Sequence, residues 1–137
     1  MGFEQFGIVS FTATTKTAQF VEFLKNNEVR GTVCTGCGAK FFPPRSDCSV
    51  CLSDAMDWFA ISGEGTLLTF TKAMFAPAGF EKDAPYMLGV AEFANRVKVF
   101  GRLDKALPED AVKQGMKVKL NIVSLEGDRV SYELTAA

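Results

Sequence analysis

Four cysteines set the strongest constraint on how this chain folds. They are the only cysteines among 137 residues, and they form two C-x-x-C pairs, Cys34 with Cys37 and Cys48 with Cys51. Each C-x-x-C turn directs two thiolates toward a common centre, and Gly38 after the first pair suits the positive φ that such a turn often needs. Two facing turns supply four sulfurs in a tetrahedron, which is how structural Zn²⁺ is bound. The spacing therefore predicts a zinc ribbon with these four cysteines as ligands.

Other uses of the cysteines fit the sequence less well. Disulfides need an oxidising compartment, and the N-terminus has neither the basic segment nor the long apolar segment of a signal peptide. A thioredoxin-like redox motif has one C-x-x-C at the start of a helix, not two in series. Iron binds the same thiolates, so sulfur ligands alone do not separate it from zinc. Four cysteine ligands leave no open coordination position, which favours a structural site over a catalytic one.

The residue types that remain for catalysis are few. The chain contains no histidine, the usual general base and the usual partner of a serine or cysteine nucleophile. Its Asp, Glu, Lys and Tyr residues form no recognisable constellation. We therefore expect no catalytic residues and no catalysis by the chain alone. An autonomous thioesterase-like or redox enzyme is the alternative, and it requires a nucleophile–base pair that the sequence does not show.

The charge balance argues against nucleic acid as a partner. Fifteen basic residues face sixteen acidic ones, with no basic run and a sequence pI near 5.5. Zinc ribbons and OB-folds do occur in single-stranded nucleic-acid-binding modules, and aromatic side chains can stack on bases. That binding module is the second functional hypothesis. No apolar stretch approaches the length of a membrane span, and we expect a reduced, cytoplasmic protein.

The first part of the chain reads as an arm, a helix and a ribbon. Residues 1–13 favour an extended arm, either docked on a partner or covering the core. Residues 14–27 have apolar side chains at helical spacing, with Thr14 or Thr15 as N-cap and Asn26–Asn27 at the end. Strands at 28–33 and 40–42 flank the first C-x-x-C turn, and two prolines then stop the pairing. We call each C-x-x-C turn a knuckle. We assign residues 14–54 to the helix and zinc ribbon.

Residues 55–137 read as a five-stranded barrel. A first strand, bent at Gly63 and Gly65, covers 56–75, and further strands follow at 86–93, 97–103, 117–125 and 129–134. A connector with a short helix after Pro108 separates the third and fourth strands. Three strands, a helix and two strands is the order of an OB-fold. A sandwich is the alternative. The fold class expected is mainly β, with an N-terminal helix, a rubredoxin-like zinc ribbon and an OB-fold.

The sequence resembles a known family of zinc-ribbon/OB-fold proteins, once catalogued as a domain of unknown function. The resemblance rests on the run CTGCGAKFFPPRSDCSVC at 34–51 after a Phe-rich helix, on SGEGTLLTF at 62–70, on Pro85–Tyr86 and on GMKV at 115–118. It covers roughly residues 14–135. Members of this family are accessory proteins of acyl-CoA metabolism that pair with thiolase-fold enzymes, aldolases or hydratases. One bacterial member is the small subunit of the benzoylsuccinyl-CoA thiolase of anaerobic toluene degradation, and this chain is similar to it in size and layout.

The resemblance implies a non-catalytic subunit of a complex that processes CoA thioesters. Zn²⁺ is then the structural cofactor, the partner is a thiolase-fold protein, and an acyl-CoA is bound with that partner. Arg45, Lys40 and Lys72 are candidates for binding CoA phosphates, although solvated surface charge is the simpler interpretation of each. Phe75, Phe80 and Tyr86 are candidates for lining an acyl site, and ordinary packing is again the simpler interpretation.

Overall fold

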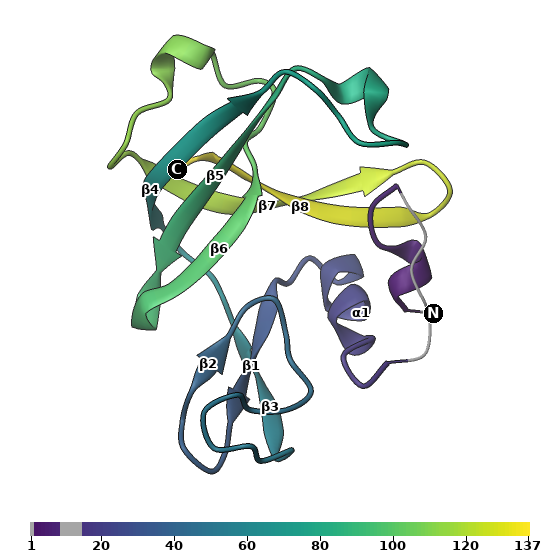
Figure 1. Cartoon of the computed structure of the whole chain (residues 1–137), viewed down its shortest axis with the longest axis vertical. Helices are drawn as coiled ribbons and strands as arrows, with labels where there is room; N and C mark the ends of the chain where they lie inside the picture. Colours follow the sequence, from purple (N-terminus) through teal and green to yellow (C-terminus); the bar gives the residue numbers. More distant parts are fainter. Residues whose placement is uncertain (1, 9–14) are drawn as a thin grey trace.

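A computed structural model of the chain describes residues 2–8 and 15–137, which form two antiparallel sheets and one α-helix (Figure 1). The helical segments are η1 (Phe3–Gln5), α1 (Gln19–Lys25), η2 (Glu81–Asp83), η3 (Ala94–Arg96) and η4 (Glu109–Ala111). The strands are β1 (Arg30–Cys34), β2 (Lys40–Phe41), β3 (Met56–Ala60), β4 (Gly65–Ala73), β5 (Tyr86–Phe93), β6 (Val97–Arg102), β7 (Lys117–Leu125) and β8 (Arg129–Ala136). None of the helices in these residues is long and apolar enough to cross a membrane.

The smaller sheet carries the cysteine knuckles. Its strand order is β2-β1-β3, so that β1 is the central strand and pairs antiparallel with both neighbours. Thr32 on β1 lies opposite both Phe41 and Trp58. Pro43 and Pro44 follow β2 and end the pairing, because neither has a backbone N–H to donate. The hairpin predicted around the first knuckle is therefore confirmed.

The prediction of one bent strand over 56–75 is wrong. β3 pairs along its whole length with β1, whereas β4 begins at Gly65 in the other sheet. β3, the segment before Gly63 and Gly65, pairs with the edge of β1 that β2 leaves open. Residues 61–64 then connect the two sheets. Sequence alternation shows which face of a strand is buried but not which neighbour it pairs with. The domain boundary at 54/55 stays a prediction.

The larger sheet closes into the predicted five-stranded barrel. Its order is β6-β5-β4-β7-β8, and every neighbouring pair is antiparallel. The two outer strands meet at a parallel bridge between Leu103 and Leu134, where the Asp104 N–H donates to the Leu134 carbonyl over 2.8 Å. This is the arrangement of an OB-fold. The helix predicted between the third and fourth barrel strands is reduced to the 3-10 turn η4 after Pro108.

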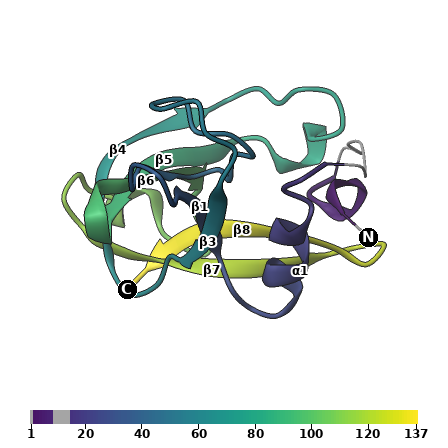
Figure 2. The same ribbon diagram turned by 90° about the horizontal axis from the view of Figure 1, so that it is seen from below.

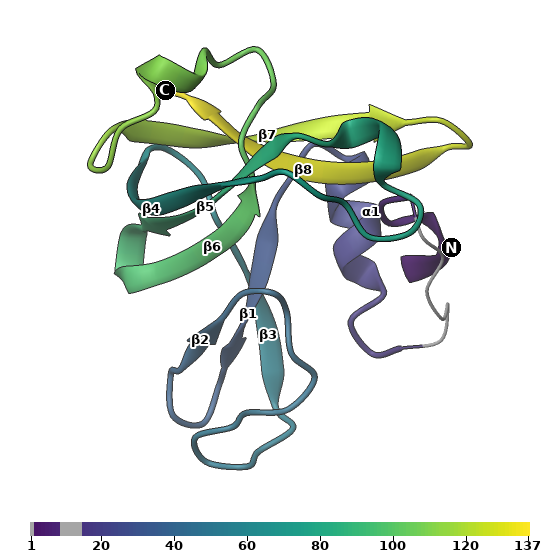
Figure 3. The same cartoon turned by 45° about the horizontal axis from the view of Figure 1, so that its top comes forward.

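The barrel core consists of alternate residues of the paired strands. Its fully buried members share the inner face of the sheet and are Leu67, Ala91, Val99, Val118 and Leu134. A bulge between Leu67 and Thr69 bends β4, as expected where a sheet curves into a barrel. The end of the β7–β8 hairpin that carries the connecting turn extends beyond the barrel toward α1 (Figure 3).

α1 fills the angle between the ribbon and the β7–β8 hairpin (Figures 1 and 2). It buries Phe20, Val21 and Leu24 against Val130 and the half-buried Tyr132. The helix is shorter than the predicted 14–27, since residues 16–18 form a turn and the position before the helix, Ala18, makes no side-chain cap. The Thr15 hydroxyl accepts from the Thr17 N–H at 3.4 Å instead of capping the α-helix, and Thr14 lies outside the described residues.

The described part of the N-terminal arm covers the core. Residues 3–5 form the 3-10 helix η1 and not the expected extended arm, while residues 9–13 lie outside the described part. Phe3 and Phe6 pack on Phe20 with ring centroids 5.9 Å away in each case. The Lys25 ammonium donates to the Gln5 side-chain amide. Of the two roles predicted for the arm, these contacts fit the covering of the core.

Candidate metal centre

The four cysteine sulfurs converge on one point. All four Sγ atoms lie within 4.8 Å of one another, and the cross-knuckle distances are 3.5 Å for Cys34–Cys51 and 3.6 Å for Cys37–Cys48. A Zn–S bond of about 2.3 Å in a tetrahedron places the sulfurs about 3.8 Å apart. The thiol positions thus have the spacing that a tetrahedral Cys₄ site requires.

The two knuckles repeat one backbone geometry. In the first, the Gly38 N–H donates to the Cys34 carbonyl over 2.8 Å; in the second, the Leu52 N–H donates to the Cys48 carbonyl over 3.0 Å. The residue after each second cysteine has a positive φ, +81° at Gly38 and +65° at Leu52. Glycine adopts this conformation without cost, whereas leucine does not. Sequence reasoning recognised the glycine and missed its leucine counterpart.

Backbone amides and neighbouring thiols separate the cysteine pKa values. The Cys37 N–H is the main cause that lowers the pKa of Cys34 to about 6, and the Cys51 N–H lowers the pKa of Cys48. The Ala39 N–H acts in the same direction on Cys37, but the adjoining thiols and burial raise the pKa of Cys37 to about 12. Four thiolates this close repel one another unless a cation lies between them. The donor set therefore fits Zn²⁺.

The loop between the knuckles is tied to the central strand. Thr32 is the one buried polar side chain among the described residues, and its hydroxyl accepts from the Arg45 N–H over 2.8 Å. The Thr35 hydroxyl donates to the Ala55 carbonyl over 2.9 Å and joins the first knuckle to the segment before β3. These bonds hold both knuckles against the ribbon sheet.

Two of the three candidate phosphate-binding cations lie on the ribbon. The Lys40 ammonium is 5.2 Å from the centre of the Phe59 ring, and the Arg45 guanidinium is 5.4 Å from that of Phe41. Arg45 also lines an open pocket of about 520 Å³ beside the second knuckle. Both cations are exposed.

The third candidate cation lies on the barrel. Lys72 forms an ion pair with Glu109 over 2.8 Å and lines a pocket of about 180 Å³ with Tyr86. Among the predicted acyl-site aromatics, Phe80 and Phe75 are not part of that lining, and Phe75 is 88% exposed. The structure does not bring the three cations, or the three aromatic residues, into one pocket.

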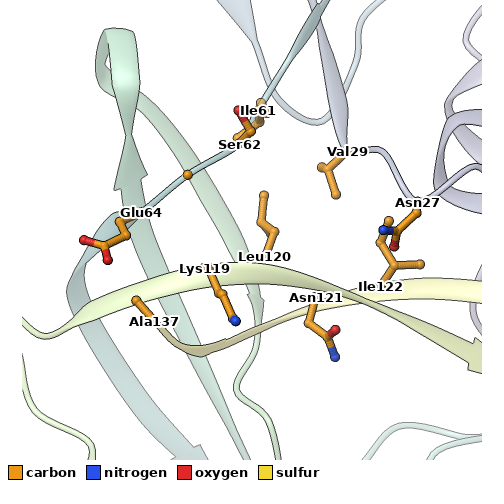
Figure 4. A pocket seen from close by; sticks show the side chains of 11 residues that line it. Asn27, Val29, Ile61, Ser62, Glu64, Lys119, Leu120, Asn121, Ile122 and Ala137 are labelled. Atoms are coloured by element: carbon orange, nitrogen blue, oxygen red, sulfur yellow. The ribbon is translucent and has the colours of Figure 1, made fainter.

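Sequence reasoning also missed a pocket of about 550 Å³ between the two sheets. Its lining comes from β7, from the connector at 61–64 and from the chain after α1 (Figure 4). The pocket depends on β3 pairing with the ribbon, so no local sequence signal could have located it.

Comparisons with known proteins agree with this architecture. Residues 21–57 match a family model described as "ChsH2, rubredoxin-like zinc ribbon domain", and residues 58–123 match "ChsH2, C-terminal OB-fold domain". In solved structures, the fold resembles one titled "Ltp2-ChsH2(DUF35) aldolase", with a TM-score of 0.76 and 21% identity over 92% of this chain and 98% of that one. A DUF35-family protein of Sulfolobus solfataricus has a TM-score of 0.61, also at 21% identity, over 93% of this chain and 90% of that one.

Curated relatives point to the same group. A DUF35 domain-containing scaffold protein of Methanocaldococcus jannaschii is 33% identical over 90 residues, which are 65% of this chain and 63% of that protein. The benzoylsuccinyl-CoA thiolase subunit BbsA of Thauera aromatica is 27% identical over 78 residues, 57% of this chain and 53% of BbsA. The chain thus spans less than two thirds of the length of the curated relatives it matches.

Proposed function

Because the chain belongs to the ChsH2 family, which joins a rubredoxin-like zinc ribbon to an OB-fold, we propose that it is a non-catalytic accessory subunit of a thiolase-fold enzyme complex acting on acyl-CoA thioesters. The observation that carries the proposal is the relationship to BbsA, a protein named as a subunit of benzoylsuccinyl-CoA thiolase. A reaction on benzoylsuccinyl-CoA or a related aromatic acyl-CoA, in the cytoplasm, is the specific form of the proposal.

In this proposal Cys34, Cys37, Cys48 and Cys51 hold one structural Zn²⁺. The ribbon sheet has only three strands, the shortest of two residues, so packing alone gives it little stability. A structural zinc site in a small peptide contributes on the order of 10–16 kcal/mol, comparable to the whole stability of a domain. The metal would keep the knuckles rigid enough to dock on a larger protein.

The tip of the second knuckle supplies apolar surface for that docking. Val50 is 70% exposed and Leu52 is 85% exposed, although neighbouring Cys48 is buried. Leu52 also holds a backbone conformation that disfavours leucine, and no packing within the described residues compensates for it. Unusual backbone conformations of this kind occur often at binding sites. We therefore place the knuckle tip in the contact with the catalytic subunit.

Within the complex, the exposed cations would meet the CoA moiety. Arg45 and Lys40 lie on the ribbon, on the same module as the knuckle tip, and pair well with phosphate. Lys72 and Tyr86 lie together at a barrel pocket, where they would meet the substrate only if the partner completes the site.

Reconstitution with a catalytic subunit tests the proposal. The chain is co-expressed with a catalytic thiolase-fold subunit from its host, and the pair is purified through a tag on that subunit. We expect co-elution at a fixed ratio and benzoylsuccinyl-CoA or acyl-CoA thiolysis that neither chain gives alone. Leu52→Asp should weaken co-elution, while Glu126→Lys on the distant β7–β8 turn should not. A zinc-loaded chain that stays a lone monomer beside the active thiolase subunit would contradict the proposal.

A further inference from the structure

The pocket between the two sheets has an open strand edge as one wall. We call it the β7 slot: one side is β7 from Lys119 to Ile122, and the other is Asn27, Val29 and the connector 61–64. Its volume of about 550 Å³ lies in the usual range of ligand pockets. Figure 4 shows Leu120 pointing from β7 toward the gap that Val29 and Ile61 border from the opposite side.

The backbone groups of β7 alternate between β8 and the slot. The Ala137 N–H donates to the Lys117 carbonyl over 3.2 Å, so Lys117 directs its backbone groups to the β8 side. Backbone N–H and C=O groups alternate in direction along an antiparallel strand. Residues 119, 121 and 123 therefore bond toward β8, whereas Leu120 and Ile122 direct their N–H and C=O groups into the slot.

The β8 strand confirms this alternation. Leu134, the register partner of Leu120, accepts from the Asp104 N–H on the side away from β7. Val130 likewise accepts from the Gly7 N–H over 2.9 Å, on that same side.

The slot edge is open because of the strand pairing in the ribbon. β4 pairs with β7 only at Gly65–Val118 and Thr66–Lys117. In this register the connector residues 61–64 would continue the pairing opposite 119–122, but the connector leads into β3, which pairs with β1 instead. Over residues 2–8 and 15–137, nothing hydrogen-bonds to the slot-facing backbone of Leu120 or Ile122. Two donors and two acceptors at strand spacing are therefore left for a ligand.

The side chains around the slot define what the ligand must present. Val29 and Ile61 are 5% and 6% exposed and form an apolar wall, which the half-buried Leu120 and Ile122 extend. Lys119 points to the opposite face of β7 (Figure 4) and has no ion-pair partner in the part of the chain that is described. A strand added here needs apolar side chains on one face and favours an acidic one beside Lys119.

We propose that the β7 slot binds an extended segment of a partner protein, which adds to β7 as a further strand. Its backbone bonds to Leu120 and Ile122, alternate apolar side chains face Val29 and Ile61, and an acidic side chain pairs with Lys119. The proposal requires a folded ribbon, but it rests neither on the proposed accessory role nor on acyl-CoA.

A titration of the full zinc-loaded chain with a designed peptide tests the slot. The probe is acetyl-Thr-Val-Glu-Val-Thr-Val-Thr-amide, followed by amide NMR and hydrogen exchange. We expect the Leu120 and Ile122 amides to shift and to gain at least tenfold protection at saturation. Two further probes carry backbone N-methyl groups, one at the valines and the other at the remaining residues, and each thus lacks one set of N–H donors. Their affinities should differ at least tenfold, since only one set of N–H groups faces β7. Equal affinity of the two would overturn the proposal.

Charge reversal provides the second readout. Lys119→Glu should lower the affinity for the peptide at least fivefold. A peptide with lysine in place of its glutamate should restore the affinity in this variant. Lys82→Glu on the loop after β4 makes the same charge change elsewhere and should leave affinity unchanged. Absence of shifts at Leu120 and Ile122 with millimolar peptide would overturn the proposal. So would a response of these amides to CoA alone but not to the peptide, which would identify a small-molecule site.

Discussion

At the scale of single residues, the two knuckles solve one backbone problem with two different side chains. The position after each second cysteine has a positive φ, and it is glycine in the first knuckle and an exposed leucine in the second. A left-handed conformation costs a residue with a Cβ roughly 1–2 kcal/mol. Leu52 thus lowers the stability of the fold, and its exposed side chain makes no packing contacts among the described residues that offset this cost.

This difference predicts opposite results for two substitutions. Gly38→Ala should lower the free energy of unfolding by about 1 kcal/mol, because alanine adopts φ +81° poorly. Leu52→Gly should leave stability unchanged or raise it by less than about 1 kcal/mol, since relief of the strain is partly offset by glycine's greater freedom in the unfolded chain. Urea unfolding of the zinc-loaded proteins measures both. A loss at Leu52→Gly equal to that at Gly38→Ala would mean that the leucine side chain stabilises the fold.

Gly31 gives a second prediction at this scale. A Cβ at this position would lie 2.3 Å from the Phe41 carbonyl oxygen and 2.9 Å from the Phe59 ring, so β1 would have to move away from its neighbours. Gly31→Ala should lower the free energy of unfolding by about 1–3 kcal/mol. Gly36→Ala in the first knuckle is the matched control, because its Cβ would meet only the Cys34 sulfur at 3.6 Å and the Cys51 sulfur at 4.0 Å, which are ordinary contact distances. Thermal unfolding that ranks the two variants equally would contradict this account.

At the scale of elements, the stability of the ribbon depends on the metal-binding knuckles, whereas the stability of the barrel depends mainly on its own core. The three ribbon strands have few buried residues of their own, whereas the barrel has a core of ten buried residues. Loss of the metal should therefore release the ribbon first.

Cys48→Ser tests this order. The variant should lose stoichiometric zinc, and the amides of β1 and β3 should lose protection from hydrogen exchange before those of β5 and β6. The physical reason is that one missing sulfur opens the tetrahedral site. Ser49→Ala, next to the ligand and exposed, should keep both zinc and protection. Full zinc content in Cys48→Ser, or simultaneous loss of protection in ribbon and barrel, would contradict the predicted order.

At the scale of the whole molecule, Tyr132 joins the parts of the chain. Its ring contacts Phe6 from the N-terminal segment, Phe20 from α1 and Phe42 after β2, with centroid distances between 5.5 and 6.5 Å. Its hydroxyl donates to the Phe100 carbonyl of β6 over 2.8 Å. Burial raises the pKa of Tyr132 to about 12 from an ordinary value of 10.0.

The raised pKa predicts a loss of stability in alkaline solution. The folded state keeps the proton that the unfolded chain loses near pH 10, so the contribution is complete below pH 10 and is lost as pH rises toward 12. The full loss, reached near pH 12, should amount to about 2–3 kcal/mol, and about half of it should be present at pH 11. Tyr132→Phe should lack this loss, while costing about 1 kcal/mol at pH 7 through the missing hydrogen bond.

Unfolding free energies at pH 7, 9, 10 and 11 measure this effect. Tyr86→Phe, which removes the other tyrosine hydroxyl, should keep the alkaline loss seen in the unmodified chain. An alkaline loss of the same size in Tyr132→Phe would assign it to other groups.

Much of this protein followed from local sequence alone. The spacing of the four cysteines determined the knuckles and the candidate metal ligands, because a C-x-x-C turn is built from residues adjacent in the chain. Alternation of apolar and polar residues located β7 to the residue, the short hairpin connection at 94–96 marked the end of β5, and the order of strands indicated the OB-fold. These signals are short-range, so they survive without knowledge of the rest of the fold.

Tertiary structure alone decided which strands became neighbours. The pattern of β3 showed a strand but not that β1 would pair with it, because a period of two specifies a face and leaves the partner open. The open edge at Leu120 and Ile122 is a consequence of that choice, as is the slot beside it. The meeting of Tyr132 with three distant phenylalanines likewise depends on how the helix, ribbon and barrel pack together, which no local stretch encodes.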